Sequence, residues 1–264
     1  MALLDPARAR VRLASDELAV ATVLLTQPDH ELLQTPDAQQ VLEELERVGA
    51  LADGQLVGYV AELVGIVAAP KLRILLETFR AEQPVVHQIW ATERHAVVGV
   101  SEPEDILELA PVEPALLYWE IARLVGLGAR PPVVVERSFA MPNATLEGVF
   151  RQLAGGEAAE ADATLQRETA LSAEERQAFL VLLLNRRISW RASSVWTSGR
   201  GRETRTMTVV DGGEAGLWLS RVEGDLGENP TIALEPSRPS VAWRGLIELL
   251  PDSAAILAST TPVG

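Results

Sequence analysis

The chain has 264 residues, of which 47% are hydrophobic and 23% charged, and a formal net charge of −14. This composition is typical of a folded globular protein, and the negative charge argues against partners rich in phosphate, such as nucleic acid or an anionic membrane surface. The chain contains no cysteine, which excludes a disulfide framework, a cysteine-ligated metal and a thiol nucleophile.

The first 70 residues contain helical patterns after one short strand. Ala9–Ala14 is predicted as the strand, and Ser15 as the N-cap of a first helix. Asp37–Val48 is predicted as a second helix. Gly54–Val67 is predicted as a third, because its apolar residues recur at the three- and four-residue spacing of one helical face.

Strands follow from residue 72. Leu72–Phe79 and Val85–Trp90 flank the loop Arg80–Pro84, and two short strands come next, at Ala96–Val100 and Ile106–Leu109. Short connections between strands favour antiparallel pairing. A helix then follows a Pro-x-x-Pro sequence, and its apolar face consists of Tyr118, Ile121, Ala122 and Val125.

The same order of elements recurs 125 residues later. Trp243, Leu246, Ile247 and Leu250 repeat the last helical face at that offset, again after Pro-x-x-Pro. The repeat includes strands at Ile188–Trp196, Thr204–Val210, Ala215–Val222 and Thr231–Leu234, with a hairpin loop at Thr197–Arg202.

The start of the second half follows the first less closely. Pro132–Arg137 is predicted as a strand, Asn143 as a helix cap, and Ser172 with Glu175 as a capping box. The counterpart of the Asp37–Val48 helix is expected to be missing. In its place, the small and acidic residues of Gly155–Ala163 predict a mobile loop or a frayed helix.

These patterns predict an α+β fold of two similar halves, residues 1–128 and 129–264, related by a pseudo-two-fold axis. Each half would be an antiparallel sheet with flanking helices, and together they would form one composite domain. Whether the halves share one continuous sheet is open at this stage.

Candidate catalytic and metal sites are weak. The three histidines, His30, His87 and His95, lack the spacing of a helical metal site, and no nucleophile elbow, P-loop or dinucleotide fingerprint occurs. We therefore expect no catalytic residue, metal or cofactor. A core position is favoured for each of the six tryptophans. Trp119 lies one position off the buried face of its helix, and if it is exposed it is a candidate interface anchor.

Two segments carry a resemblance to a known family. GQLVGYVAELVGIVAAP (54–70), which leads into KLRILLETF, and the closing run from DGGEAGLWLSRV to TIALEPSRPSVAWRGLIELLP (211–251) resemble the EspG family of type VII (ESX) secretion chaperones. The resemblance implies two halves about a pseudo-two-fold axis and a cytoplasmic, non-enzymatic chaperone. Such a chaperone would bind a helical secretion substrate of the PE–PPE or WXG100-like type.

By this resemblance the partner would dock on the Arg80–Pro84 loop and on the helical surface of the second half. The expected partner-binding residues are Arg80, Glu82, Gln83 and Trp119. The N-terminus has no basic segment followed by a long apolar run, and no apolar run is long enough to span a membrane, so a cytoplasmic protein is expected.

Two alternatives from other classes stay open. One is an enzyme or ligand-binding protein with its site between the halves, for which His87, His95, Arg94 and Glu93 are the clustered candidates. The other is a structural homodimer formed through exposed sheet edges.

Overall fold

The computed structural model describes residues 2–79, 84–131, 133, 138–223 and 229–251. The first half contains β1 (Leu3–Asp5), β2 (Arg10–Ala14), α1 (Ser15–Thr26), α2 (Pro36–Arg47), β3 (Leu51–Ala52), β4 (Gln55–Leu56), α3 (Gly58–Ala68), β5 (Leu72–Phe79), β6 (Val85–Ala91), β7 (Ala96–Glu102), β8 (Ile106–Val112) and α4 (Leu117–Val125). The second half contains β9 (Phe139–Pro142), α5 (Asn143–Ala154), α6 (Ala158–Glu168), α7 (Ala173–Leu184), β10 (Ile188–Ser198), β11 (Gly201–Asp211), β12 (Leu217–Glu223), β13 (Thr231–Ser237) and α8 (Pro239–Leu249).

The two halves share one sheet. Among the described residues it has eleven strands in the order β1-β2-β8-β7-β6-β5-β10-β11-β12-β13-β9, and every neighbouring pair is antiparallel. The halves meet where β5 pairs with β10 over eight residues, from Phe79 opposite Ser189 to Leu72 opposite Trp196. The α+β fold and the antiparallel sheets are therefore confirmed, and the question of a shared sheet is answered. The strand order outward from this junction is alike on both sides, while the pseudo-two-fold axis itself stays a prediction.

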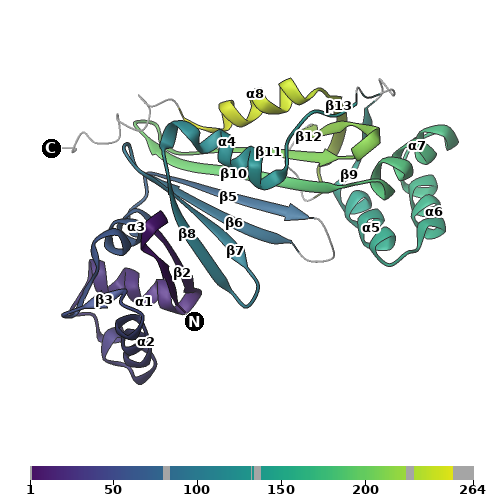
Figure 1. The fold of residues 1–264 in the computed structure, drawn as a ribbon. Coiled ribbons are helices and arrows are strands. Elements are labelled where there is room, and N and C mark those ends of the chain that lie inside the picture. Colours follow the sequence, from purple (N-terminus) through teal and green to yellow (C-terminus); the bar gives the residue numbers. More distant parts are fainter. Residues whose placement is uncertain (1, 80–83, 132, 134–137, 224–228, 252–264) are drawn as a thin grey trace.

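Helices cover the two sheet faces unequally (Figure 1). α4 and α8 lie side by side over the centre of one face. The helices α1–α3 and α5–α7 form two lobes at opposite ends of the molecule, and each packs on the outer strands of its own half. The centre of the sheet thus has α4 and α8 on one side and a space between two lobes on the other.

The alternation of side chains along the central strands explains this layering. Leu72, Ile74 and Leu76 of β5 are buried beneath α4 and α8, whereas Arg73 and Leu75 are exposed on the opposite face. Successive side chains of a strand point to opposite faces, so one face of β5 belongs to the core and the other faces solvent. The core beneath α4 and α8 contains residues of both halves, including Trp190 and Leu246.

Most predicted strands are confirmed, several with longer bounds. The Thr197–Arg202 loop is shorter than predicted, because β10 and β11 pair as far as Ser198 opposite Gly201 and leave a two-residue turn. Pro111 and Pro236 lie within β8 and β13, while Pro114 and Pro239 occupy the first helical turn that follows, where a missing N–H removes no helical bond.

The prediction for Gly54–Val67 is wrong at its beginning. Asp53 and Gly54 adopt positive φ angles of 52° and 73° and form a two-residue turn between β3 and β4, so the helix begins at Gly58. An Asp-Gly pair with positive φ at both positions is the turn that best matches the twist of paired strands. The turn therefore overrides the helical spacing of the residues before Gly58.

The prediction for Gly155–Ala163 is also wrong. Residues from Ala158 onward form the regular helix α6, whose Ala161, Thr164 and Leu165 are buried against the α5–α7 lobe. Packing of these side chains against the rest of the lobe stabilises a helix that the local composition alone would not stabilise. The counterpart of α2, which we expected to be missing, is therefore present as α6, between α5 and α7.

The helix caps agree with the prediction in one case of three. The Ser172 hydroxyl accepts the Glu175 N–H at 3.2 Å, and the Glu175 carboxylate accepts the Ser172 N–H at 2.8 Å, which is the predicted capping box. Ser15 and Asn143 are the first helical residues instead of the caps. The Ala144 N–H of α5 donates to the side-chain oxygen Oδ1 of Asn229 at 2.9 Å. The predicted strand Pro132–Arg137 falls largely outside the described residues.

Candidate partner-binding surface

The centre of the sheet has one face on which no described helix packs, and we call it the open face. It contains Arg73, Leu75 and Glu77 of β5, together with Arg191, Ser193 and Val195 of β10. Trp90 and Val210 lie on the same side of the sheet but are covered by the two lobes. The lobes therefore border the open face at both ends, as Figure 1 shows below β5 and β10.

Polar contacts link neighbouring strands on the open face, and the contact between Arg191 and Glu77 joins the two halves. The Arg191 Nε donates to the Glu77 carboxylate at 2.6 Å, and this contact raises the pKa of the Arg191 guanidinium. The Ser193 and Thr206 hydroxyls lie 3.1 Å apart on neighbouring strands. Leu75 is 40% exposed among these polar groups. A flat surface of mixed character, framed by two lobes, suits a protein partner better than a small ligand, which needs a concave pocket.

An exposed apolar strip lies on α7, the helix that precedes β10 in the chain. Val181 and Leu184 lie one helical turn apart, and Leu184 is 59% exposed. α7 ends four residues before β10 begins, and Ser189 of β10 pairs with Phe79 at the end of β5. The apolar strip therefore lies near the end of the open face where the β5–β6 connection begins.

A second exposed apolar surface lies on the opposite side of the molecule, on α4 and α8. We call it the α4–α8 ridge. Its exposed apolar side chains are Leu116 in the turn before α4, Trp119 on α4, and Val241 and Ile247 on α8. Trp119 is 55% exposed, and its ring centroid lies 4.7 Å from that of Trp243 in an edge-to-face arrangement. The core placement favoured for each tryptophan is therefore wrong for Trp119, whereas its role as an interface anchor stays a prediction. Its ring is held in place by a partner from the other half.

The structure does not place all the expected partner-binding residues. Arg80, Glu82 and Gln83 lie outside the described residues, between Phe79 at the end of β5 and Val85 at the start of β6. Trp119 belongs to the helices over the buried face of the sheet. No residue of the open face or of the apolar strip on α7 was named as a partner contact from the sequence. Exposure at Leu75 and Leu184 depends on which elements pack nearby, and the strand and helix patterns do not contain that information.

The candidate residues for an enzyme do not converge in the structure. His87 lies within β6, where its Nδ1 accepts the Ser101 N–H at 3.2 Å, and His95 lies beyond the end of the same strand. Ala91, the last residue of β6, lies four positions beyond His87, a rise of about 13 Å along the strand. Glu93 is bound to Lys71, and this contact lowers the pKa of its carboxyl. Among the described residues, no group of three or more His, Asp or Glu side chains could hold a metal ion.

Comparison with known protein families decides where this fold belongs. The sequence pattern of the EspG family matches residues 9–241, which is most of the chain. The chain belongs to the EspG family. This assignment agrees with the resemblance of segments 54–70 and 211–251, both of which lie wholly or mostly within the matched range.

A solved EspG structure shares the fold. It is the type VII secretion system chaperone EspG5 of Mycobacterium tuberculosis, determined in complex with a PE25–PPE41 dimer. The match has a TM-score of 0.60 at 15% sequence identity and covers 92% of this chain and 97% of that one. No curated protein matches the chain. Within the described residues of this EspG chain, every helix is too short or too polar to cross a membrane.

Proposed function

We propose that this EspG chain is a non-enzymatic, cytoplasmic chaperone that binds a PE–PPE-type secretion substrate. The observation that carries the proposal is its membership of the EspG family, together with a fold match over nearly the whole length of EspG5, a chaperone solved with its PE–PPE dimer bound. The absence of a convergent catalytic cluster among the described residues is compatible with this function, and the exposed apolar groups supply contact area for a protein.

We place the docking surface on the open face and the apolar strip of α7. We also assign to it Arg80, Glu82 and Gln83, which belong to the connection between β5 and β6. Apolar side chains amid polar ones are the usual anatomy of an interface that forms between soluble partners. Trp119 on the α4–α8 ridge is the second proposed contact, since exposed tryptophans often anchor interfaces. The two locations lie on opposite faces of the sheet, and separate variants can therefore distinguish them.

The test is co-expression with a PE–PPE pair from the same organism, followed by size-exclusion chromatography and calorimetry. We expect a stable complex, and we expect Leu184→Glu with Val181→Glu to weaken it at least tenfold, because each change buries a charge in an apolar contact. Trp119→Ala tests the second location. Leu32→Glu, at an exposed apolar position on the first-half lobe, is the matched control.

The outcomes separate the function from the surface. No complex with any PE–PPE pair of the organism would contradict the chaperone function. A complex of unchanged affinity in both the α7 and Trp119 variants would retain the function but overturn the proposed surface.

A further inference from the structure

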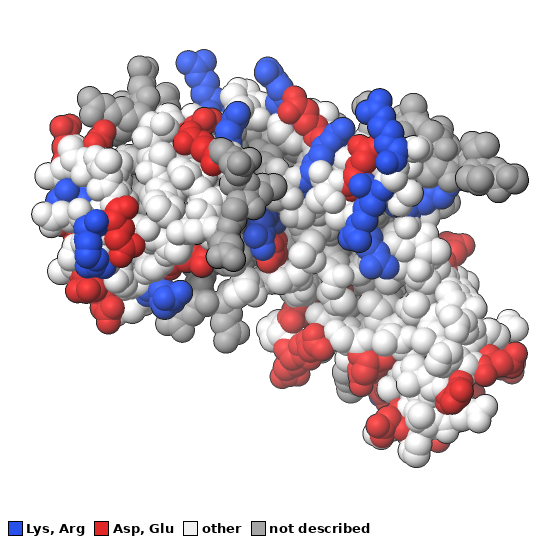
Figure 2. Space-filling view, turned by 180° about the vertical axis from the view of Figure 1, so that it is seen from behind, with Lys and Arg blue, Asp and Glu red and all other residues white. Residues whose placement is uncertain are grey.

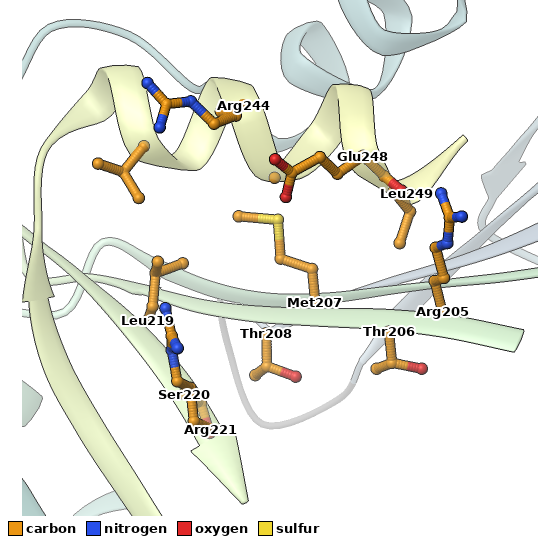
Figure 3. Close-up of a pocket in the computed structure, with 12 residues that line it drawn as sticks. Arg205, Thr206, Met207, Thr208, Leu219, Ser220, Arg221, Arg244, Glu248 and Leu249 are labelled. Atoms are coloured by element: carbon orange, nitrogen blue, oxygen red, sulfur yellow. Dashed lines mark hydrogen bonds between the residues drawn. The ribbon is translucent and has the colours of Figure 1, made fainter. Parts of the chain in front are cut away.

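A groove of about 600 Å³ lies between α8 and the strands β11 and β12 (Figure 3). Met207 and Leu219 project from the strands toward the helix, while Thr206 and Thr208 project to the other side of β11. The helix contributes Arg244, Gly245 and Glu248 to the wall. A Cβ atom at Gly245 would lie 2.7 Å from the Met207 sulfur, so glycine leaves the room that Met207 occupies. The volume is within the range of binding sites for small molecules or short peptides.

The groove opens onto a free strand edge. β11 begins at Gly201, but its pairing with β12 covers just Thr208–Asp211, opposite Leu217–Ser220. Residues 201–207 of β11 and 221–223 of β12 therefore lack a strand partner on the sides that face each other, within the described part of the chain. Unpaired backbone groups along a strand edge are a template for an extended peptide.

Arginines surround the opening. Arg221 is joined to Glu235 at 3.0 Å in a solvent-exposed pair, and Arg244 has no ion pair within the described residues. Arg205 donates to the carbonyl oxygens of Glu248 and Leu250 at 2.5 and 3.0 Å, which fixes the end of α8 beside the groove. Against these three arginines, Glu248 is the acidic residue of the lining.

The positive charge of this region contrasts with the rest of the chain. The lining of the groove contains three arginines and one glutamate, although the net charge of the whole chain is −14. Figure 2 shows Lys and Arg gathered over the upper part of the molecule, while acidic side chains dominate the lower right lobe, which contains α1–α3. The groove is therefore expected to favour ligands that carry negative charge over ligands that carry positive charge.

We propose that the groove beside α8 binds an extended acidic peptide segment, which adds as a strand to the free edge of β11. The backbone of β11 would fix the direction and register of the segment, and Arg221 and Arg244 would pair with its carboxylates. Met207 and Leu219 would contact apolar side chains at alternate positions. The proposal does not depend on the chaperone function, because α8 and the groove wall that it forms belong to the covered face of the sheet.

The first test uses fluorescein-labelled eight-residue peptides in which Val alternates with Glu or, as a control, with Lys. Fluorescence anisotropy on the full chain should show saturable binding of the Glu peptide that weakens as salt increases. Arg221→Glu with Arg244→Glu should weaken it at least tenfold. Arg94→Glu with Arg151→Glu is the matched control, since both residues are exposed and distant from the groove.

A second test addresses strand addition. Two versions of the Glu peptide carry N-methyl groups on alternate backbone nitrogens, one at the odd and one at the even positions, and one of the two should not bind. Hydrogen exchange should show protection of amides 201–207 in the complex with the unmodified Glu peptide. Equal binding of the Glu and Lys peptides, an unchanged affinity in the Arg221 and Arg244 variant, or protection elsewhere would overturn the proposal.

Two further outcomes also count against it. If the arginines serve just to guard a free edge against aggregation, neither peptide will bind. If the Glu peptide does not bind but the chain binds vesicles containing phosphatidylserine, and the double variant loses that binding, the groove recognises lipid instead of peptide.

Discussion

At the scale of single residues, the ion pair of Arg130 with Asp211 is the most buried one among the described residues, and it joins distant segments. The Arg130 guanidinium donates to both carboxylate oxygens, and these contacts raise its pKa. Asp211 is buried and also accepts the Gly213 N–H at 3.0 Å. We expect Asp211→Ala to lower the free energy of unfolding by about 3 kcal/mol, because it leaves the part-buried Arg130 guanidinium without its carboxylate and the Gly213 N–H without its acceptor.

Urea unfolding followed by circular dichroism measures that loss. Arg123→Ala is the control, because Arg123 pairs with Glu120 one turn away on the exposed side of α4. Exposed pairs contribute about 0–1 kcal/mol. Equal decreases in the free energy of unfolding of the two variants would show that burial of the Arg130–Asp211 pair does not add to its contribution to stability.

The Lys71–Glu93 contact predicts a pH dependence. Hydrogen bonding to Lys71 lowers the pKa of the Glu93 carboxyl from its ordinary value of 4.5. A carboxyl whose folded pKa is depressed stabilises the fold above its unfolded pKa, and that contribution is lost as pH falls through the folded pKa. Glu93→Gln should therefore be less stable than the parent at pH 7, and the difference should shrink below pH 4.5. A difference that is constant between pH 7 and pH 3 in urea titrations would contradict this.

At the scale of elements, α6 is the helix that its composition least supports. Leu165 is fully buried in the core of the α5–α7 lobe beside Val149 and Phe179. Leu165→Ala should lower stability by about 3 kcal/mol through lost burial and the cavity that remains. Glu160→Ala, at an exposed position of the same helix, should change it by less than about 0.5 kcal/mol. Similar effects in both variants, measured by urea unfolding, would mean that α6 is not held by packing.

Elements were predictable where one sequence signal acts alone. β5 has its predicted bounds because Leu72–Phe79 alternates between buried and exposed faces without interruption. At residues 53–57, a turn signal and a helical pattern overlap. The prediction followed the helical spacing, whereas in the structure Asp53-Gly54 forms a hairpin turn. At α6, the deciding contacts with α5 and α7 come from other segments, so local composition could not predict them.

At the scale of the whole molecule, the duplicated pattern predicted two similar halves but could not predict how they join. Pairing of β5 with β10 depends on two strand edges separated by more than a hundred residues, and no local signal specifies that partner. The proposed docking surface depends on the same joining, because the open face exists where β5 and β10 meet between the lobes. The spacing placed Trp119 one position off the buried helical face, but a core position was favoured for each tryptophan, and its exposure became clear when the packing of α4 against α8 was known.

We propose that residues 1–128 and 129–264 form one composite domain and unfold together. Leu76 of β5 is fully buried opposite Ala192 of β10, within a core to which both halves contribute. Leu76→Ala should cost about 3 kcal/mol, which is a factor of about 100 in the unfolding equilibrium. Because the core is shared, amides of β8 and β13, one in each half, should exchange faster with deuterium by a similar factor.

Leu45→Ala is the matched comparison. Leu45 is equally buried, but it lies in the α1–α3 lobe and contacts first-half residues. Peripheral units of a protein can open without global unfolding, so this variant should accelerate exchange mainly in α1–α3 and leave β13 less affected. If Leu76→Ala instead accelerates exchange in β8 alone, the second half keeps its stability without the first. The chain would then consist of two domains joined by a strand pair, and the open face could change shape when a partner binds.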